Sequence, residues 1–442
     1  MPPVMPATDN LVAMLGIAAV TIAGRATFGS WLHPGAFFAL AWLFLLVFSF
    51  SAPLFGAEQY YVWSGALWWI ALTLVCVYVG SLLGSRAATP VRDPLPLPTS
   101  GRQFRYAVPL IMASALGSTV WPIAVPQLVV WGDHPPMYLQ VFLGLHYLGP
   151  ILGGLLFGAS REWGHRMLAL ATILPGIFFG VLDTGRSKVV MQVAYFFTGY
   201  FTMLVFMHRQ RAVALFSAGR TMAAVASVVL FLVIGVVFTP FRGVPRDLPV
   251  PEKMRQYRAL LEHDILLYSW EWMHSSIFGH PAMFSSYFEL AWADPPTTPK
   301  FPQQTAAGVY RAFGYELPEP LYTVVGGEAT NVFTIFKPPI EDFTMPGALF
   351  IFLGWGALSG WAYRKMQFGS LWPGVFLAHY YANATNIGGN FLTYNSQTGA
   401  FVIIGVYLWY LERYGCLRGL GAALPSGVMT RPTWGAIPRG AR

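Results

Sequence analysis

Three ionisable residues, Lys337, Glu341 and Asp342, stand in the segment 331–347, where a long polar stretch meets an apolar run. A bilayer tolerates such groups beside its hydrocarbon only where they are paired, solvated or bound to a charged ligand. The segment therefore predicts a binding or catalytic site. The alternative is an interfacial anchor, in which the lysine stem lies along apolar surface and its charged end reaches water.

Arg186 and Lys188 form a second cationic pair, in a short loop that the charge distribution described below assigns to the outer side. Cations are uncommon in short outer loops of membrane proteins. A bound anion would explain the pair, and arginine offers phosphate a planar fork where lysine offers a point charge. Contact with lipid headgroups is the alternative explanation.

The segment 241–345 is far longer than a connection between helices needs to be, which indicates a functional loop. Apolar residues recur at three- and four-residue steps from Met254 to Trp272 and predict an amphipathic helix on the bilayer surface. That helix would hold Arg255 and Arg258 over a lipid-linked substrate, or would simply present them to solvent. The next part combines polar and aromatic groups that suit sugar rings but also occur at membrane interfaces: His274, His280, Tyr287, Glu289 and Trp292.

Membrane-spanning helices must position these residues. Of the 442 residues, 55% are hydrophobic and 10% are charged, with a mean hydropathy of +0.52, so the chain is a polytopic membrane protein. The composition predicts a single all-α transmembrane bundle over residues 1–442 with about eleven spans. Apolar runs lie near 10–24, 34–55, 61–84, 106–130, 137–158, 167–182, 189–207, 221–239, 346–361, 371–389 and 398–411.

The placement of charge predicts the orientation of this bundle. With a cytoplasmic C-terminus, 17 of the 27 Lys and Arg residues fall inside, among them Arg25, Arg86, Arg364 and Lys365. The tail 412–442 is then cytoplasmic, and the 241–345 loop faces the periplasm. The net charge of +8 reflects this topology, and nothing in the sequence indicates binding to nucleic acid.

Two motifs within the apolar runs predict contacts between helices. Gly356 and Gly360 are four residues apart, a spacing that favours close helix packing. His379 is expected to make an interhelical hydrogen bond. Cys76 and Cys416 provide neither a disulfide framework nor a thiolate metal site, and no metal-binding motif is apparent.

The segment 331–347 resembles the signature of the Wzy-type oligosaccharide repeat-unit polymerases, which assemble O-antigen and exopolysaccharide. Family members tend to show Asn-Val-Tyr-Thr, an aromatic residue, a basic residue, Pro, and then Asp-Phe-Gly. The matching residues, in order, are Asn331, Val332, Phe333, Thr334, Phe336, Lys337, Pro338, Asp342, Phe343 and Gly347. The segments 184–187 and 278–289 are similar to further family features, and the resemblance extends over about half of the chain. The chain departs from the family pattern at two positions. Lys337 occupies the position at which family members commonly have Arg, and Thr344 occupies the position of the Gly that follows Asp-Phe.

The resemblance implies a GT-C-like, metal-independent glycosyltransferase without a cofactor, in a bacterial inner membrane with its active site facing the periplasm. A growing glycan would pass from polyprenyl diphosphate to the non-reducing sugar of another lipid-linked repeat unit. Membrane lipid and a chain-length regulator, or co-polymerase, are the further partners implied. Arg186 is expected to hold the diphosphate, helped by some of Arg242, Arg246, Arg255, Arg258, Arg311 and Lys337; Asn331, Thr334 and Tyr287 are expected to contact the substrate.

The attacking hydroxyl needs a base, for which Asp342 and His280 are the candidates. Asp342 stands in the signature, and the ordinary pKa of histidine suits proton transfer. Alternatively, Asp342 caps the span beginning near Thr344 or pairs with Lys337, and His280 bonds the backbone in a turn before Pro281. An O-antigen ligase and a non-enzymatic polysaccharide transporter or flippase are the alternative functions.

Overall fold

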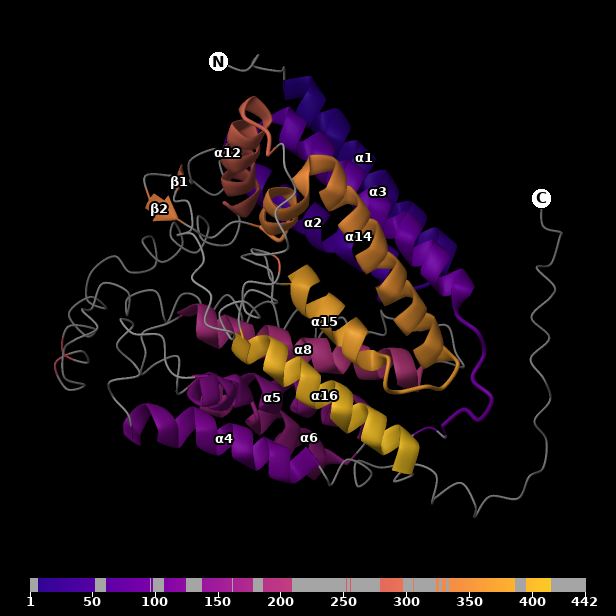
Figure 1. The fold of residues 1–442 in the computed structure, drawn as a ribbon, viewed down its shortest axis with the longest axis vertical. Helices are drawn as coiled ribbons and strands as arrows, with labels where there is room; N and C mark the ends of the chain where they lie inside the picture. The colour runs from indigo at the N-terminus through magenta and orange to yellow at the C-terminus, as the bar shows by residue number, and fades with distance from the viewer. Residues whose placement is uncertain are drawn as a thin grey trace.

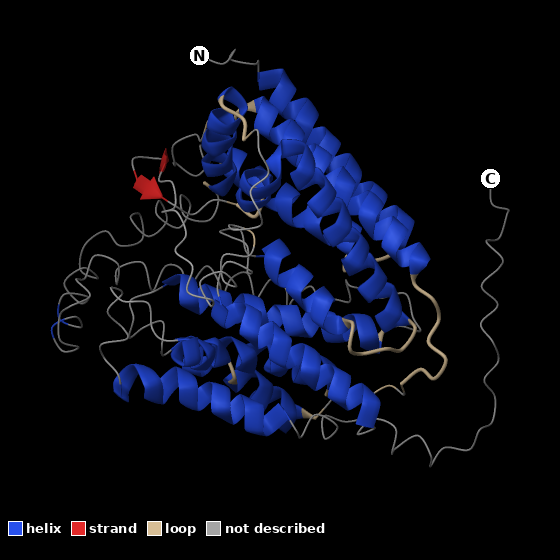
Figure 2. Cartoon of the chain, viewed as in Figure 1, coloured by secondary structure: helices blue, strands red, loops and turns tan. Residues whose placement is uncertain are grey.

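The computed structural model describes residues 7–51, 61–95, 97, 107–124, 137–160, 162–177, 186–208, 252, 255, 279–296, 305, 323–325, 328–330, 334–385 and 395–414. Nearly all of them are helical (Figure 2). The helices are α1 (Ala7–Phe28), α2 (Pro34–Phe50), α3 (Ser64–Ala87), α4 (Ala107–Ala124), α5 (Met137–Ala159), α6 (Trp163–Ala171), α8 (Arg186–Met207), α12 (His280–Ala293), α14 (Lys337–Gln367), α15 (Gly374–Thr385) and α16 (Asn395–Tyr414). Strands β1 (Thr323–Val325) and β2 (Glu328–Thr330) pair antiparallel, with Val324 opposite Ala329.

Three helices of the described part are long and apolar enough to cross a membrane: Thr8–Phe28, Ser64–Ala87 and Lys337–Gln367. The chain is therefore a helical membrane protein. Shorter apolar helices, α2 and α8 among them, lie where the sequence predicts further spans. The predicted run 221–239 and the predicted amphipathic helix lie outside the described residues, apart from Glu252 and Arg255.

The described helices form two groups (Figure 1). In the first group, α1, α2, α3, α12 and α14 pack together, and in the second, α4, α5, α6, α8 and α16 do so. Helix α15 contacts α8, α14 and α16 and lies between the two groups. The first group thus combines the three N-terminal helices with α12 and α14 from the second half of the chain, and the signature segment lies in this group.

Helices α3 and α14 join along a seam of glycines, which confirms the close packing predicted from Gly356 and Gly360. A Cβ atom at Gly360 would collide with the backbone of Ser81, and one at Gly84 would collide with the carbonyl of Ala357. Since glycine has no side chain, the two backbones approach closely at these positions. The seam fixes α14, and with it Lys337, relative to α3.

The start of α15 is held by Glu412 of α16. The Glu412 carboxylate accepts hydrogen bonds from the Ser370 hydroxyl at 2.9 Å and from the backbone N–H groups of Leu371 and Trp372 at 2.8 Å each. These N–H groups precede the helix and have no partner within it. The carboxylate therefore fixes the turn between α14 and α15.

Two boundaries differ from the sequence prediction. Helix α14 begins at Lys337, inside the predicted 241–345 loop, because Pro338 and Pro339 are well accommodated in a first helical turn. The predicted span 167–182 is broken, since α6 ends at Ala171 and a turn follows.

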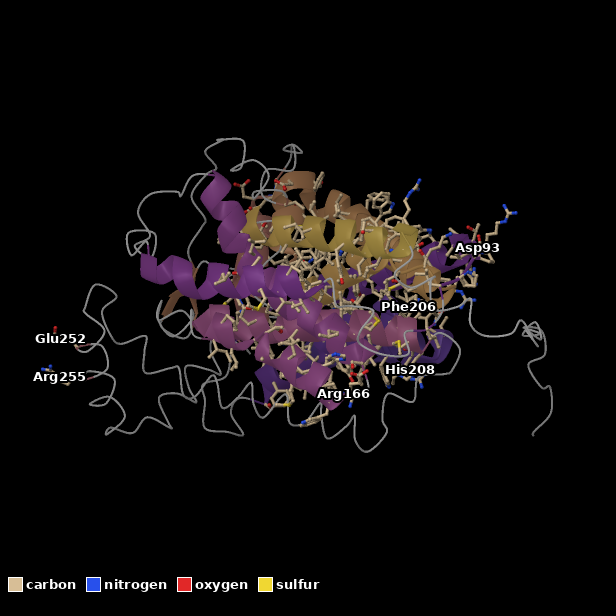
Figure 3. All side chains as sticks on the ribbon, turned by 90° about the horizontal axis from the view of Figure 1, so that it is seen from below. Asp93, Arg166, Phe206, His208, Glu252 and Arg255 are labelled. Carbon is tan, nitrogen blue, oxygen red and sulfur yellow. The ribbon has the colours of Figure 1, made fainter. Side chains whose placement is uncertain are left out.

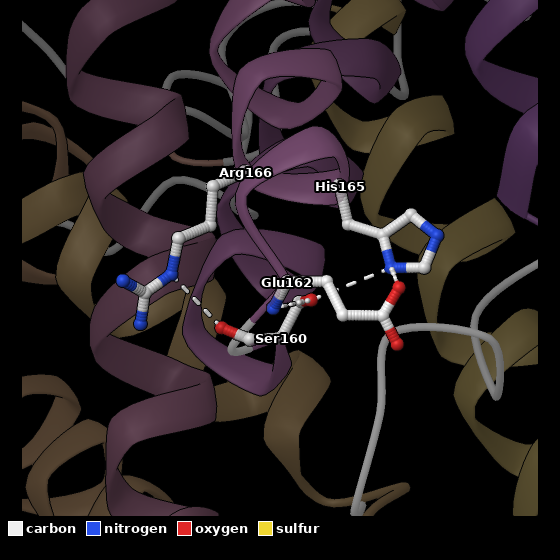
Figure 4. Close-up of polar contacts among 4 residues, drawn as sticks. All are labelled: Ser160, Glu162, His165 and Arg166. Carbon is white, nitrogen blue, oxygen red and sulfur yellow. Dashed lines mark hydrogen bonds and ion pairs between the residues drawn. The ribbon is translucent and has the colours of Figure 1, made fainter.

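The turn before α6 is built around Ser160 (Figure 4). The Ser160 hydroxyl accepts from the Glu162 N–H at 3.1 Å, and the Ser160 carbonyl accepts from Arg166 Nε at 3.0 Å. His165 Nδ1 lies 3.2 Å from Glu162 Oε2. This network ends α5 and starts α6, and it is remote in the chain from the signature.

Candidate functional site

Phe336 anchors the signature segment in the first group of helices. Its ring is fully buried, with centroid distances of 4.7 Å to Trp42, 5.2 Å to Phe284 and 5.4 Å to Trp69. These rings come from α2, α12 and α3, so the aromatic position of the signature joins three helices to the start of α14. Thr334 precedes it, fully buried, with its hydroxyl accepting from the Phe336 N–H at 3.4 Å.

Lys337 is a buried cation at the first position of α14. Its Nζ lies 3.7 Å from Glu341 Oε1, one helical turn further on, and 5.4 Å from the ring centroid of Tyr287 on α12. A buried ammonium needs such partners, because removal from water without them is very costly. The ion pair and the aromatic face therefore hold Lys337 in a defined place.

Tyr287 lies beside this cation and within the electrostatic reach of two carboxylates. Burial raises the pKa of the Tyr287 hydroxyl, and the nearby charges of Glu341 and Asp342 raise it further. The hydroxyl therefore keeps its proton and remains a hydrogen-bond donor across the physiological range. Tyr287, Lys337, Glu341 and Asp342 form what we call the α12–α14 cluster.

Asp342 is the most deeply buried charged member of the cluster, with 0% of its surface exposed. Its Oδ2 accepts a hydrogen bond of 2.6 Å from the backbone N–H of Thr305. Hydrogen bonds to a carboxylate are among the stronger ones in proteins. Asp342 thereby ties the loop at Thr305 to α14, which sequence inspection missed because the two residues are 37 positions apart.

His280 is the first residue of α12 rather than part of an isolated turn. Burial lowers the pKa of its imidazole to about 4, so the ring is neutral near pH 7. Its Nδ1 has no hydrogen-bond partner in the part of the chain that the structure describes. His280 lies seven residues before Tyr287 on α12, about 10 Å along the helix axis.

In the described part of the chain, further buried polar atoms at the start of α3, on α12 and at Thr305 have no hydrogen-bond partner. They are Trp63 Nε1, Ser64 Oγ, Trp69 Nε1, Glu289 Oε1 and Thr305 Oγ1. A native protein seldom leaves such atoms unpaired, and where it does they call for an explanation, such as bound water or a ligand. The combination of indole N–H, hydroxyl and carboxylate groups beside aromatic rings suits a polyhydroxylated ligand.

Thr344, which follows the cluster residues on α14, has a strained backbone. Its φ of +66° and ψ of 172° interrupt α14 two residues before Pro346. A β-branched residue rarely adopts this region, which glycine occupies readily. Such strain persists only where the surrounding structure imposes it, and it is concentrated at functional sites. The kink separates the cluster from the apolar part of α14.

The structure brings together four of the residues predicted to form the site: Thr334, Lys337, Tyr287 and Asp342. Arg186 is the first residue of α8, in the second group of helices. Arg255 is exposed and, with Glu252, lies apart from the helices in Figure 3. Arg242, Arg246, Arg258, Arg311 and Asn331 lie outside the described residues.

The sequence predicts an interhelical hydrogen bond for His379, whereas among the described residues its hydrogen-bond partner is Asn383 of the same helix. Asn383 Nδ2 lies 3.2 Å from His379 Nε2, and both residues belong to α15. The contact with α16 is instead an edge-to-face arrangement with Phe401, at 5.2 Å between ring centroids. A polar side chain can satisfy its neighbour one helical turn away, which makes a partner on another helix unnecessary.

Comparison of the chain with family models, with curated proteins and with solved structures gives no match. The residue types and their geometry carry the functional conclusion below.

Proposed function

We propose that this protein polymerises lipid-linked oligosaccharide repeat units. A glycan is transferred from polyprenyl diphosphate to the non-reducing sugar of another lipid-linked unit. The observation that carries this proposal is the α12–α14 cluster, in which Lys337 lies against the ring of Tyr287 from a distant segment and pairs with Glu341. A simple interfacial anchor would not require a cation, a tyrosine and the carboxylate of Asp342 to be buried in one segment pair.

Asp342 accepts the proton of the attacking sugar hydroxyl in this reaction. The hydroxyl oxygen forms a bond to the anomeric carbon of the donor, and the bond from that carbon to the diphosphate breaks. Polyprenyl diphosphate leaves with the electron pair. Asp342 is suited to this role because a carboxylate can accept a proton and because it lies buried in the signature segment, five residues after Lys337.

His280 is a weaker base, since a pKa of about 4 disfavours proton uptake near neutral pH. Its unpaired Nδ1 is instead suited to accept a hydrogen bond from a sugar hydroxyl. The indole N–H groups of Trp63 and Trp69 would donate to sugar oxygens in the same region. We assign these three residues to substrate binding and the basic residues, Arg186 first, to the leaving diphosphate.

The backbone of Thr344 also supports the proposal. Resemblance to the polymerase signature places a glycine after Asp-Phe, where this chain has Thr344. The chain nevertheless keeps the glycine-type conformation there, with φ at +66°. A conformation retained against the preference of the residue suggests that the bend itself is needed.

The overall fold, the membrane location and the partner belong to the same proposal. We propose a metal-independent glycosyltransferase with a GT-C-like bundle of about eleven spans in a bacterial inner membrane. The cluster would face the periplasm, and the basic end of α14, with Arg364 and Lys365, would face the cytoplasm. A chain-length regulator would act as partner.

A glycan gel of cells lacking the gene tests the proposal. The cells are complemented with wild type, Asp342→Asn or Lys337→Gln, and with Asp294→Asn and Lys365→Gln as controls of the same chemistry away from the cluster. We expect single repeat units to accumulate in the deletion strain, with both cluster variants at least about 100-fold less active and both controls producing long polymer. Long polymer in the deletion strain would exclude the polymerase function, and wild-type polymer with Asp342→Asn would exclude Asp342 as the base.

A further inference from the structure

Two arginines lie on neighbouring helix ends, at the end of the first helix group that lies opposite the α12–α14 cluster. Arg25 belongs to the last turn of α1, and Arg364 belongs to the last turn of α14. Phe28 of α1 stacks on His33 at 3.4 Å between ring centroids, and His33 meets Tyr363 of α14 edge to face at 4.7 Å. Both arginine side chains are half-buried. Two like charges thus stand on helix ends that are joined through His33, with limited access to water.

Among the described residues, this pair is not neutralised by an acidic side chain. Neither arginine forms an ion pair there, and the hydrogen bond of Arg364 goes to the neutral Gln367 amide oxygen at 2.9 Å. Arg25 lies 5.8 Å from the ring centroid of Trp31, and Arg364 lies 4.7 Å from that of Phe368. A guanidinium placed over a ring keeps its in-plane N–H groups for a planar or tetrahedral oxyanion.

A neutral, closely packed histidine lies between the two helix ends. His33 is buried and stacked on Phe28 at 3.4 Å. Its Nδ1 accepts from the Gly35 N–H at 3.2 Å, so its Nε2 carries the proton and donates to Ser85 Oγ at 3.0 Å. A neutral histidine with both nitrogens occupied offers no competing partner for the arginines. Within the described residues, the site therefore has two cations beside a neutral polar group and no anionic side chain.

A helix dipole explains only part of this arrangement. Cations at helix C-termini interact favourably with the dipole, and Arg86 at the end of α3 fits that description, since it is exposed. Lys365 likewise has its own partner, the Thr89 hydroxyl at 3.0 Å. The dipole accounts for one cation at each helix end. It does not account for two half-buried guanidinium groups on neighbouring helix ends.

We propose that Arg25 and Arg364 bind the phosphate of an anionic phospholipid headgroup. The helical part of α14 that follows the break at Thr344 runs about 27 Å from Pro346 to Arg364, close to the thickness of the hydrocarbon core of a bilayer. The site therefore lies in the headgroup layer opposite the cluster. Ile22, three residues before Arg25 on α1, is 65% exposed and offers apolar surface for an acyl chain. A phospholipid headgroup is a better candidate for the ligand than free phosphate, because the site borders membrane-facing surface.

Binding is tested with the full chain, purified in neutral detergent and titrated with short-chain phosphatidylglycerol. Thermal unfolding reports the bound state, since a ligand that binds only the folded protein raises Tm. Short-chain phosphatidylcholine and inorganic phosphate are the ligand controls. We expect phosphatidylglycerol to raise Tm more than either control, and Arg25→Gln and Arg364→Gln each to weaken its binding about tenfold. Arg86→Gln, an exposed cation at the same end, should leave binding unchanged.

An equal response to phosphatidylcholine, or an equal loss with Arg86→Gln, would overturn the site, because it would indicate general association with lipid. A Tm rise with inorganic phosphate as large as that with phosphatidylglycerol would overturn the assignment to a lipid. Arg25→Lys and Arg364→Lys keep the charge if the glutamine variants fail to fold. Weaker binding in these lysine variants supports the guanidinium contacts, and unchanged binding contradicts them.

Discussion

Lys337 Nζ lies 5.4 Å from the ring centroid of Tyr287, although the two residues are 50 positions apart in the chain. This contact joins the first turn of α14 to the middle of α12. It places a buried cation over an aromatic face, an arrangement that is strongest when both partners are shielded from water. The relationship also explains why a short signature segment alone does not define the site: one of the four members of the cluster, Tyr287, comes from another helix.

Removing the ring beneath Lys337 should cost more than removing its hydroxyl. Tyr287→Leu loses the cation–π contact and the packing of the ring, so we expect a loss of about 3 kcal/mol in the free energy of unfolding. Tyr287→Phe keeps the ring and should lose about 1 kcal/mol. Denaturant unfolding in detergent measures both values. Equal losses would show that the ring does not support Lys337.

Relieving the strain at Thr344 should stabilise the fold. Glycine adopts a φ of +66° without a steric penalty, so Thr344→Gly should raise the free energy of unfolding by about 1 kcal/mol, after its greater freedom in the unfolded chain is subtracted. Thr344→Ala keeps a Cβ atom and serves as the control, with no comparable gain expected. A gain in Thr344→Ala that matches Thr344→Gly would contradict backbone strain as the cause.

Filling the glycine seam should separate α3 from α14. A Cβ atom at Gly84 would collide with the Ala357 carbonyl, so Gly84→Ala should destabilise the protein by about 2 kcal/mol. Gly16 on α1 has open space around its Cβ position, and Gly16→Ala provides a matched control with no loss expected. Thermal unfolding in the same detergent compares the two. Unchanged stability in Gly84→Ala would mean that the helices can move apart without cost.

His280 should make the protein sensitive to acid. Its ordinary pKa is 6.5, and burial lowers it to about 4 in the folded protein, so the unfolded chain binds the additional proton between these values. The contribution of His280 to stability is therefore full above pH 6.5 and falls by about 3 kcal/mol as pH approaches 4. His280→Gln should flatten this part of the pH profile. A profile identical to wild type would show that His280 is not buried in the neutral form.

Much of the helical framework follows from local sequence. The predicted runs 34–55, 137–158 and 398–411 lie on α2, α5 and α16, because length and hydropathy are properties of a contiguous segment. The spacing of Gly356 and Gly360 likewise indicated close packing without revealing the partner helix. Helix boundaries were less predictable, as the early start of α14 at Lys337 illustrates, since prolines that end many helices also begin them.

Local sequence was enough to identify a helical membrane protein whose signature carries a cation and two carboxylates at a helix boundary. The folded structure was needed to show which distant groups complete that site: Tyr287 for Lys337, and the Thr305 N–H for Asp342. It was also needed to show that His33 joins the helix ends that carry Arg25 and Arg364. The physical reason is that burial, charge pairing and backbone strain depend on neighbours across the fold, whereas hydropathy and helix propensity are properties of each segment on its own.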